Sequence, residues 1–507
     1  MTNTIDSNVT GLRFAEEAAL KTLPGSPVWY PLEPNGYDDF GGETKLMSRN
    51  PINPSRQRKK GVITDLDAKG GFAQDVTQTN SLRLLQGFMF ADIREKLSNI
   101  PMNGNAIAIT GVTGSSKTIA IASTGASYLA SDLIYASGFD SAANNGLKTV
   151  ASSTGTTVVV SETMADETST GTPKIQKVGY TFGSGVATID VSGTWPRLVR
   201  GSGAKDFTTF GLIPGEWVFI GGDTSGTKFA NAANNGFARV RAVAATYIEF
   251  DKTSSDMATD TGTGKTVQLF YGNALKNESL ADDIIRRTYQ LERTLGEDAD
   301  GTMSEYLVGA VANELSLQIK PADKVLMNCS FVACDVESYD GLTGLKSGTR
   351  PTIVQADAFN TSSDFTRINL HVVTNGEPNP TPLWAYMTDL TVDVKNGASP
   401  LKAVGTLGAF DMSVGTFEVS AQLTAYFVNV DAMSAVRNND DVSLDAAIVK
   451  NNAGFVIDIP LLALGDGRLK IEQDKPITIP LKADAAECDA GYTLLLNEFP
   501  YLPDAAQ

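Results

Sequence analysis

The chain has 507 residues, which exceeds a single ordinary core, so the sequence predicts two or more domains. Its 42% hydrophobic and 20% charged residues are typical of a folded protein, and no apolar run reaches the roughly 20 residues of a membrane-spanning helix. The N-terminus lacks the basic and apolar segments of a secretory signal, and three cysteines are an odd number for a disulfide framework. We therefore expect synthesis in a reducing cytoplasm and no membrane insertion by this chain.

The net charge of −17 is unevenly distributed along the chain. Residues 1–110 carry 12 basic and 12 acidic side chains, and residues 111–265 carry 12 and 13. Residues 266–507 hold the remaining 17 of the 41 basic and 33 of the 58 acidic side chains. Because an acidic surface repels phosphate, the distribution argues against a protein that reads nucleic acid. Ordinary solubility charge is the alternative interpretation.

Residues 1–76 are rich in turn-forming residues. Trp29, Tyr30, Tyr37 and Phe40 lie among prolines and glycines, so we expect an ordered loop or arm at 29–42 rather than a core strand. The aromatic rings need an apolar partner, either a neighbouring subunit or their own domain.

A basic cluster follows at 48–60 and includes Arg56, Arg58, Lys59 and Lys60. The cluster is short and lacks interleaved aromatic residues, so nucleic-acid binding is not the favoured interpretation. We expect a solvated loop or one that pairs with acidic groups of a neighbour.

A helical period then appears between residues 77 and 97. Leu82, Leu85, Met89, Ile93 and Leu97 are spaced by three and four residues. The glycine at position 87 weakens a continuous helix, so a short helix followed by a strand fits equally well.

Residues 111–265 form a region rich in Gly, Ser, Thr and Ala that contains an internal repeat. The stretch FDSAANNGL at 139–147 recurs as FANAANNGF at 229–237, with an offset of 90 residues. Each copy, near 139–160 and 229–250, indicates an Asn-Gly turn, a strand and a β-branched strand. We expect a pair of related small β modules inserted into the chain.

Strict alternation of apolar residues characterises residues 266–507. It is clearest at 325–333, 417–427 and 477–481. Period two predicts strands with one buried face, which is typical of a β-sandwich or barrel. Short helices are expected at 431–437 and 443–450. The predicted fold is therefore mainly β, with short flanking helices.

The sequence contains few of the residue patterns from which an active site could be assembled. His371 is the single histidine, which excludes triads and zinc sites that need others. The segments 111–118 and 259–266 only approach a phosphate-binding loop, because each lacks one of the required glycines. We predict no catalytic, cofactor-binding or metal-binding residues.

Several stretches together resemble the long class of phage tail tube proteins. They are SRNPINPSR at 48–56, GGF at 70–72, NSLRLLQG at 80–87, GTFEVSAQLTAYF at 415–427 and LGDG at 464–467. The resemblance implies a β-sandwich tube domain flanked by a helix, six subunits in a ring, and rings stacked into a tube that conducts DNA. It implies no catalytic residues. Its partners would be copies of itself and other virion tail proteins: a terminator, a baseplate or tip, a tape measure, with a sheath as a further candidate.

With this resemblance the chain divides into three regions. Residues 1–110 would form an N-terminal arm and the first part of the tube domain, and 266–507 its remainder. The insertion at 111–265 would lie on the exterior of the tube, since large insertions avoid subunit contacts. We further expect the excess carboxylates of 266–507 to face, in part, an acidic lumen, and the arm at 29–60 to lie between stacked rings.

Two other functions remain open on the sequence. A carbohydrate-binding or adhesin protein would use exposed tryptophans for sugar stacking, the candidates being Trp29, Trp195, Trp217 and Trp384. Another virion assembly protein, such as a capsid or tail-completion protein, would form shells or a single ring.

Overall fold

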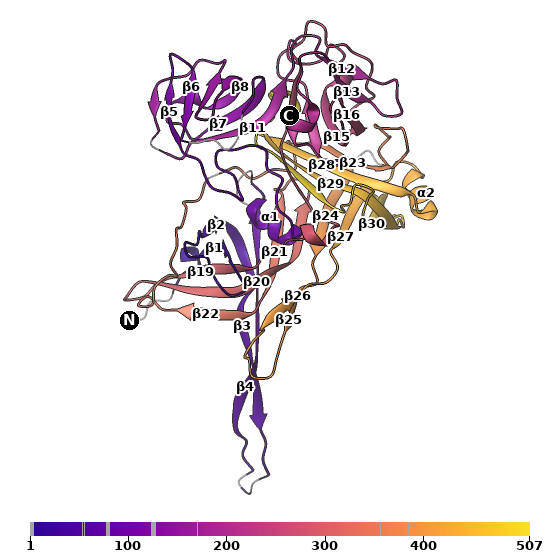
Figure 1. Cartoon of the computed structure of the whole chain (residues 1–507). Helices are drawn as coiled ribbons and strands as arrows, with labels where there is room; N and C mark the ends of the chain where they lie inside the picture. Colours follow the sequence, from indigo (N-terminus) through magenta and orange to yellow (C-terminus); the bar gives the residue numbers. More distant parts are fainter. Residues whose placement is uncertain are drawn as a thin grey trace.

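The computed structural model describes residues 5–52, 54, 56–77, 82–122, 128–169, 171–354, 356–383 and 386–507. Within these residues antiparallel strands form two large sheets and a small one. The α-helices α1 (Leu82–Met89) and α2 (Asp431–Asn438) are short. The prediction of a mainly β fold with short flanking helices is therefore confirmed (Figure 1). Short 3-10 helices lie at Ser7–Val9, Ala142–Asn144, Phe207–Phe210, Ala232–Asn234, Ala281–Asp283 and Asp504–Ala506.

The larger sheet has 16 strands and combines both ends of the chain. Its N-terminal strands are β1 (Gly11–Glu16), β2 (Tyr30–Leu32), β3 (Pro34–Arg49) and β4 (Lys59–Asp75). The others are β18 (Asn273–Lys276), β19 (Tyr289–Glu297), β20 (Thr302–Ile319), β21 (Leu326–Ala333), β22 (Asp335–Tyr339), β23 (Phe365–Val372), β24 (Met387–Lys395), β27 (Glu418–Tyr426), β28 (Asp441–Lys450), β29 (Ala453–Asp466), β30 (Thr478–Ala485) and β31 (Leu495–Phe499). Strands β25 (Ser399–Leu401) and β26 (Asp411–Ser413) form a separate hairpin.

Eight strands of this sheet form a continuous antiparallel run in the order β3-β4-β21-β20-β24-β27-β30-β29, here called the eight-strand run. Successive residues of a strand point to opposite faces. One face is apolar and buried, as at Leu315 opposite Val394 and Leu317 opposite Val392. Helix α1 belongs to the same hydrophobic core, to which it contributes buried leucines and Phe88. This burial fixes which face of the run remains accessible.

Helix α1 is shorter than the helical period suggested. Gly87 lies so close to Tyr289 that a Cβ atom would be 2.5 Å from the tyrosine Oη, so the position needs glycine. Phe90 has a φ of 47°, and the chain leaves the helix there. Ile93 and Leu97 follow in bends and isolated bridges. Of the two alternatives for 77–97 the short helix is right, but the strand after it is wrong.

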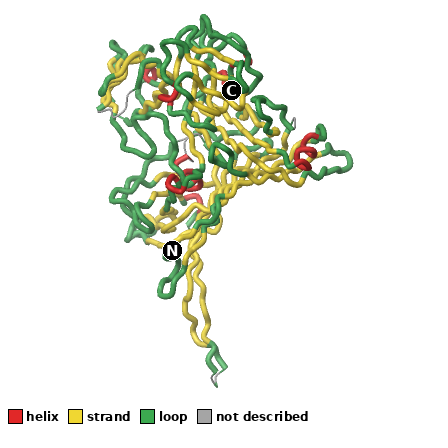
Figure 2. Tube along the Cα trace, turned by 45° about the vertical axis from the view of Figure 1, so that its right-hand side comes forward, coloured by secondary structure: helices red, strands yellow, loops and turns green. Residues whose placement is uncertain are grey.

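Strands β3 and β4 form a long hairpin that projects from the body of the molecule (Figures 1 and 2). Of the two alternatives predicted for 29–42, a loop or an arm, the loop is wrong for the residues of β3, which form a strand of this projecting hairpin. Pro34 is the first residue of the strand, where proline is tolerated. The register shifts between Asp38 and Gly41, where Asp39 has a φ of 45°, so a bulge accommodates the turn-forming residues.

The C-terminal half largely follows its sequence pattern. The alternating segments at 325–333, 417–427 and 477–481 correspond to β21, β27 and β30, and the helix expected at 431–437 is α2. The helix expected at 443–450 is wrong, because these residues belong to β28. That strand is buried on both faces, so its residues show no alternation from which a strand could be recognised.

The second large sheet has 13 strands, all between residues 109 and 271. They are β5 (Ile109–Thr113), β6 (Thr118–Ile121), β7 (Asp132–Ser137), β8 (Gly146–Ser153), β9 (Thr157–Val160), β10 (Glu167–Thr168), β11 (Lys174–Thr181), β12 (Ala187–Asp190), β13 (Arg197–Arg200), β14 (Trp217–Ile220), β15 (Gly236–Val243), β16 (Tyr247–Thr253) and β17 (Gln268–Tyr271). The proposed domain boundaries and the exterior location of this region stay predictions.

The repeat extends over this sheet except for the edge strand β10, which pairs with β5 and has no counterpart among the described strands. Inward from β10 the order is β5-β6-β9-β8-β7-β11, and from the other side it is β12-β13-β16-β15-β14-β17, with β11 paired to β17 between them. The repeated asparagines make the same bonds: Phe139 N donates to Asn145 Oδ1 at 3.0 Å, and Phe229 N donates to Asn235 Oδ1 at 2.9 Å. The recurring residues are therefore those that hold the turn before each hairpin.

Buried charges attach this second sheet to the first. Arg239 of β15 donates to Asp251 at 2.9 Å and to Asp458 of β29 at 3.1 Å, and Tyr492 donates to Asp458 at 3.1 Å. Burial raises the pKa of Asp458, and the Arg239 guanidinium opposes that shift. A carboxylate in such surroundings needs its cation, because an unpaired buried charge is costly.

We expect Arg239→Met to lower the free energy of unfolding by about 3–5 kcal/mol, because it leaves Asp458 buried without its guanidinium. Chemical denaturation followed by fluorescence measures this. The control is Arg241→Met: Arg241 pairs with Glu249, but its side chain is 48% exposed, so the cost should stay below about 1 kcal/mol. Equal losses in the two variants would show that the buried network does not stabilise the protein.

Candidate functional site

The accessible face of the eight-strand run is polar, and its residues form rows across the strands. We call this surface the polar face. One row contains Asp38, Gly71, Ser330, Glu314, Lys395 and Glu418; the next contains Gly36, Ala73, Asn328, Ser316, Asp393, Ser420, Asp484 and Ala463; the third contains Gln318, Thr391, Gln422, Lys482 and Gly465. Cross-strand partners share a face in an antiparallel sheet, so these side chains lie on one surface.

Carboxylates outnumber cations on the polar face. The acidic members of the three rows are Asp38, Glu314, Asp393, Glu418 and Asp484, and the basic ones are Lys395 and Lys482. Lys395 lies between Glu314 and Glu418, so its charge is compensated by cross-strand neighbours. The surface therefore presents a net negative charge.

The polar face is also hollowed. A cavity of about 350 Å³ opens across β3, β4, β21, β20 and β24, and Asp38, Ser316, Asn328, Asp393 and Lys395 are among its lining residues. The concavity is open and carries charged and polar side chains beside apolar ones, so it does not enclose a small ligand.

The described residues of the projecting end of the β3–β4 hairpin (44–52, 54 and 56–64) are called the arm tip. Leu46 lies opposite Ile63 and Met47 opposite Val62, so apolar pairs occupy both faces of the hairpin. These four side chains are 64%, 55%, 63% and 56% exposed, respectively. Apolar side chains are thus exposed on both faces of the arm tip, which is unusual for the surface of a single chain.

The arm tip is also basic. Arg49 lies opposite Lys59, and like charges in this arrangement are unfavourable without an acidic partner. Arg56, Arg58 and Lys60 are exposed nearby. Positively charged side chains are thus concentrated at the end of the hairpin.

The aromatic residues predicted as contacts do not lie at the arm tip. Trp29 is fully buried, where its Nε1 donates to Ser347 O at 3.0 Å. Tyr30 is half-buried beside Arg83 and Phe14. Tyr37 and Phe40 pack on each other at the base of the hairpin, under Arg293. Trp29 thus packs against its own chain, while Arg56, Arg58, Lys59 and Lys60 remain accessible.

A catalytic or metal centre is not apparent in the described part of the chain. His371 is buried in β23 opposite Ser443, which gives it a structural environment. Burial raises the pKa of the Cys334 thiol to about 11, so this cysteine is a poor nucleophile. Within the described ranges no three His, Cys, Asp or Glu side chains gather to hold a metal ion, and no helix there is long and apolar enough to span a membrane.

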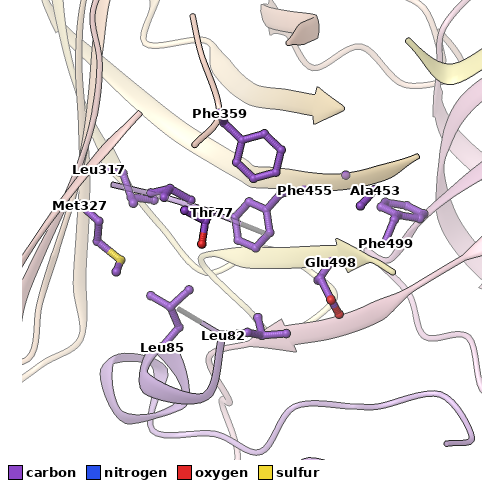
Figure 3. Close-up of a pocket in the computed structure, with 12 residues that line it drawn as sticks. Thr77, Leu82, Leu85, Leu317, Met327, Phe359, Ala453, Phe455, Glu498 and Phe499 are labelled. Atoms are coloured by element: carbon purple, nitrogen blue, oxygen red, sulfur yellow. The ribbon is translucent and has the colours of Figure 1, made fainter. Parts of the chain in front are cut away.

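An apolar pocket lies between α1, β29 and β31 (Figure 3). Its volume of about 40 Å³ is far below the roughly 300 Å³ at which ligand sites begin. Glu498 lies at its edge and accepts from Asn273 Nδ2 at 2.6 Å. Burial raises the pKa of this carboxyl. The pocket is a packing void rather than a substrate site.

Comparison with known proteins identifies the family of the chain. A family model described as phage tail tube protein matches residues 7–485. The chain belongs to the phage tail tube protein family. It is therefore a structural protein of a bacteriophage virion, located in the tail, and assembles with copies of itself and with other tail proteins. No curated protein matches the chain.

The polar face was not predicted residue by residue. The sequence located the excess of carboxylates in 266–507, and Glu314, Asp393, Glu418 and Asp484 come from there. Asp38 comes from the N-terminal segment instead. Alternation within β20 and β27 could have named their polar positions, but only the pairing of the strands shows that these share one surface with Asp38.

Proposed function

We propose that this tail tube protein is a non-enzymatic subunit that closes into rings and stacks into a tube, with the polar face lining a lumen through which DNA passes during genome ejection. The resemblance noted above implies six subunits in each ring. The single observation that carries the proposal is the net negative, hollowed polar face of a sheet whose opposite face is buried. A lining that repels phosphate does not retain DNA.

The arm tip would then lie between stacked rings. Its exposed apolar pairs on both faces require cover from two sides, which a junction between rings provides. Arg49, Arg56, Arg58, Lys59 and Lys60 would meet acidic groups of the next ring, where complementary charges guide docking. The sheet of residues 109–271 would decorate the exterior.

The burial of the tryptophans argues against the adhesin alternative. Trp29 and Trp217 are fully buried, and Trp195 is half-buried beneath the guanidinium of Arg241. Trp384 lies outside the described residues. A sugar-stacking site needs exposed rings. Another virion assembly protein remains the second candidate, and the shape of the assembly separates the two.

Electron microscopy of the purified protein at several concentrations tests the tube directly. We expect hollow tubes or stacked rings. Addition of a tail-tip or initiator complex belongs in the same experiment, because nucleation is the slow step of polymerisation. Shells, a single unstacked ring, or subunits that stay monomeric even with the initiator would contradict the proposal.

A charge test addresses the lumen. We expect phage carrying Glu314→Lys, Asp393→Lys, Glu418→Lys and Asp484→Lys to eject DNA about tenfold more slowly at low salt, with the effect shrinking as salt rises. Release of DNA, followed by dye binding after receptor addition, measures the rate. The matched control replaces the same residues with Gln or Asn, which adds no cation. Unchanged kinetics in intact lysine-bearing tails would place the polar face outside the lumen.

The arm tip is tested by Leu46→Ser combined with Met47→Ser. Both side chains are more than half exposed in the single chain, so the subunit should keep its stability. We expect polymerisation to fail, because the substitution removes apolar area from both contacts. Sedimentation measures assembly, with Thr64→Ser as the control. Normal tubes from the double variant would show that the arm tip does not lie at the junction between rings.

A further inference from the structure

The 16-stranded sheet contains a second duplication, which was not predicted from the sequence. The first unit pairs its strands in the order β1-β19-β20-β21-β4-β3. The second unit pairs its strands in the order β23-β28-β29-β30-β27-β24. Every pairing is antiparallel in both units. The two orders match strand by strand.

The order along the chain matches as well. The first unit runs β1, β3, β4, α1, β19, β20 and β21, and the second runs β23, β24, β27, α2, β28, β29 and β30. Each unit has one helix of 8 residues at the same place, after its hairpin strands. The sheet of residues 109–271 falls between α1 and β19, where the second unit has only the short turn between α2 and β28. The chain thus contains two copies of one building unit.

Inside the chain the two units are joined edge to edge. Strand β20 of the first unit pairs with β24 of the second from Glu314 opposite Lys395 to Ile319 opposite Leu390. This junction continues both the polar face and the buried face from one unit to the next. It shows how one such unit binds another.

The corresponding junction is left open at both edges of the eight-strand run, at β3 and at β29. The counterpart of β24 is β3, which pairs only with β4 among the described strands. The counterpart of β20 is β29. On the side where β29 pairs with β28, the ladder stops at Ala463, and no described strand continues it beside residues 464–470. Exposed edges of this kind are ready to pair with another chain.

We propose that β3 of one copy pairs with residues 464–470 of the next copy, so that junctions between chains repeat the β20–β24 junction within each chain. A ring of six units then contains three chains rather than six. The proposed occupant is a second copy of this chain, because that copy offers the counterpart of the edge that β24 meets within the chain. This inference rests on the proposed function, which supplies the closed ring that the chains share.

The geometry of a β-barrel supports three chains per ring rather than six. With strands about 4.8 Å apart, the eight strands of one chain supply roughly 38 Å of circumference. Three copies give a barrel of about 24 strands, roughly 37 Å across before strand tilt widens it, whereas six copies give about 48 strands and roughly 73 Å. A channel for a single duplex needs only the narrower barrel.

The number of chains is measured by native mass spectrometry of rings assembled from a mixture of tagged and untagged protein. Three chains per ring give four species that differ by the mass of one tag, and six chains give seven. Four species are the expected result, and seven overturn the inference. Absence of any ring contradicts the proposed function instead, so the two failures are distinguishable.

The edges are tested by cysteine cross-linking of assembled rings. Gly36→Cys or Asp38→Cys on β3 is combined with Gly465→Cys or Arg468→Cys, and Ser316→Cys with Asp393→Cys is the control pair within one chain, since these residues are direct partners. We expect oxidation of at least one β3 combination to yield covalent dimers and trimers and nothing larger. If the control pair forms its disulfide and no β3 combination links two chains, the proposed junction is wrong.

Discussion

The alternation of side chains along the eight-strand run is the constraint on which the rest of the structure depends. One face must be buried, and a shared core that includes α1, β28 and β31 buries it. The other face remains accessible, and the residues that β20, β24, β27 and β30 place there make it polar and acidic. A slip of one residue in any pairing would exchange the two faces, so the buried core also fixes the chemistry of the accessible surface.

Duplication explains how a single chain builds so large a molecule. The sheet of residues 109–271 consists of two modules that meet at β11 and β17, and the larger sheet consists of two units that meet at β20 and β24. Each pair is joined by an antiparallel edge, the simplest way to satisfy backbone groups that would otherwise stay unpaired. The buried Arg239 and Asp458 pair then fastens one duplicated sheet to the other.

The sequence predicted the parts of this fold that leave a local pattern. The alternating strands, the helix α2 and the asparagine-containing repeat each have a period or a recurring motif in neighbouring residues. Strand β28 was missed because burial on both faces removes alternation. The hairpin strand β3 was missed because its proline and glycines are accommodated by a bulge that only the paired strand reveals. The polar face depends on partners hundreds of residues apart, so no local pattern could assemble it.

The central claim is that the polar face lines the lumen of the tube. Electron cryomicroscopy of assembled tubes at side-chain resolution tests it most directly. We expect Glu314, Asp393, Glu418 and Asp484 to point toward the tube axis and residues 109–271 to lie on the outer surface. A map in which these carboxylates face outward or are buried between subunits would contradict it.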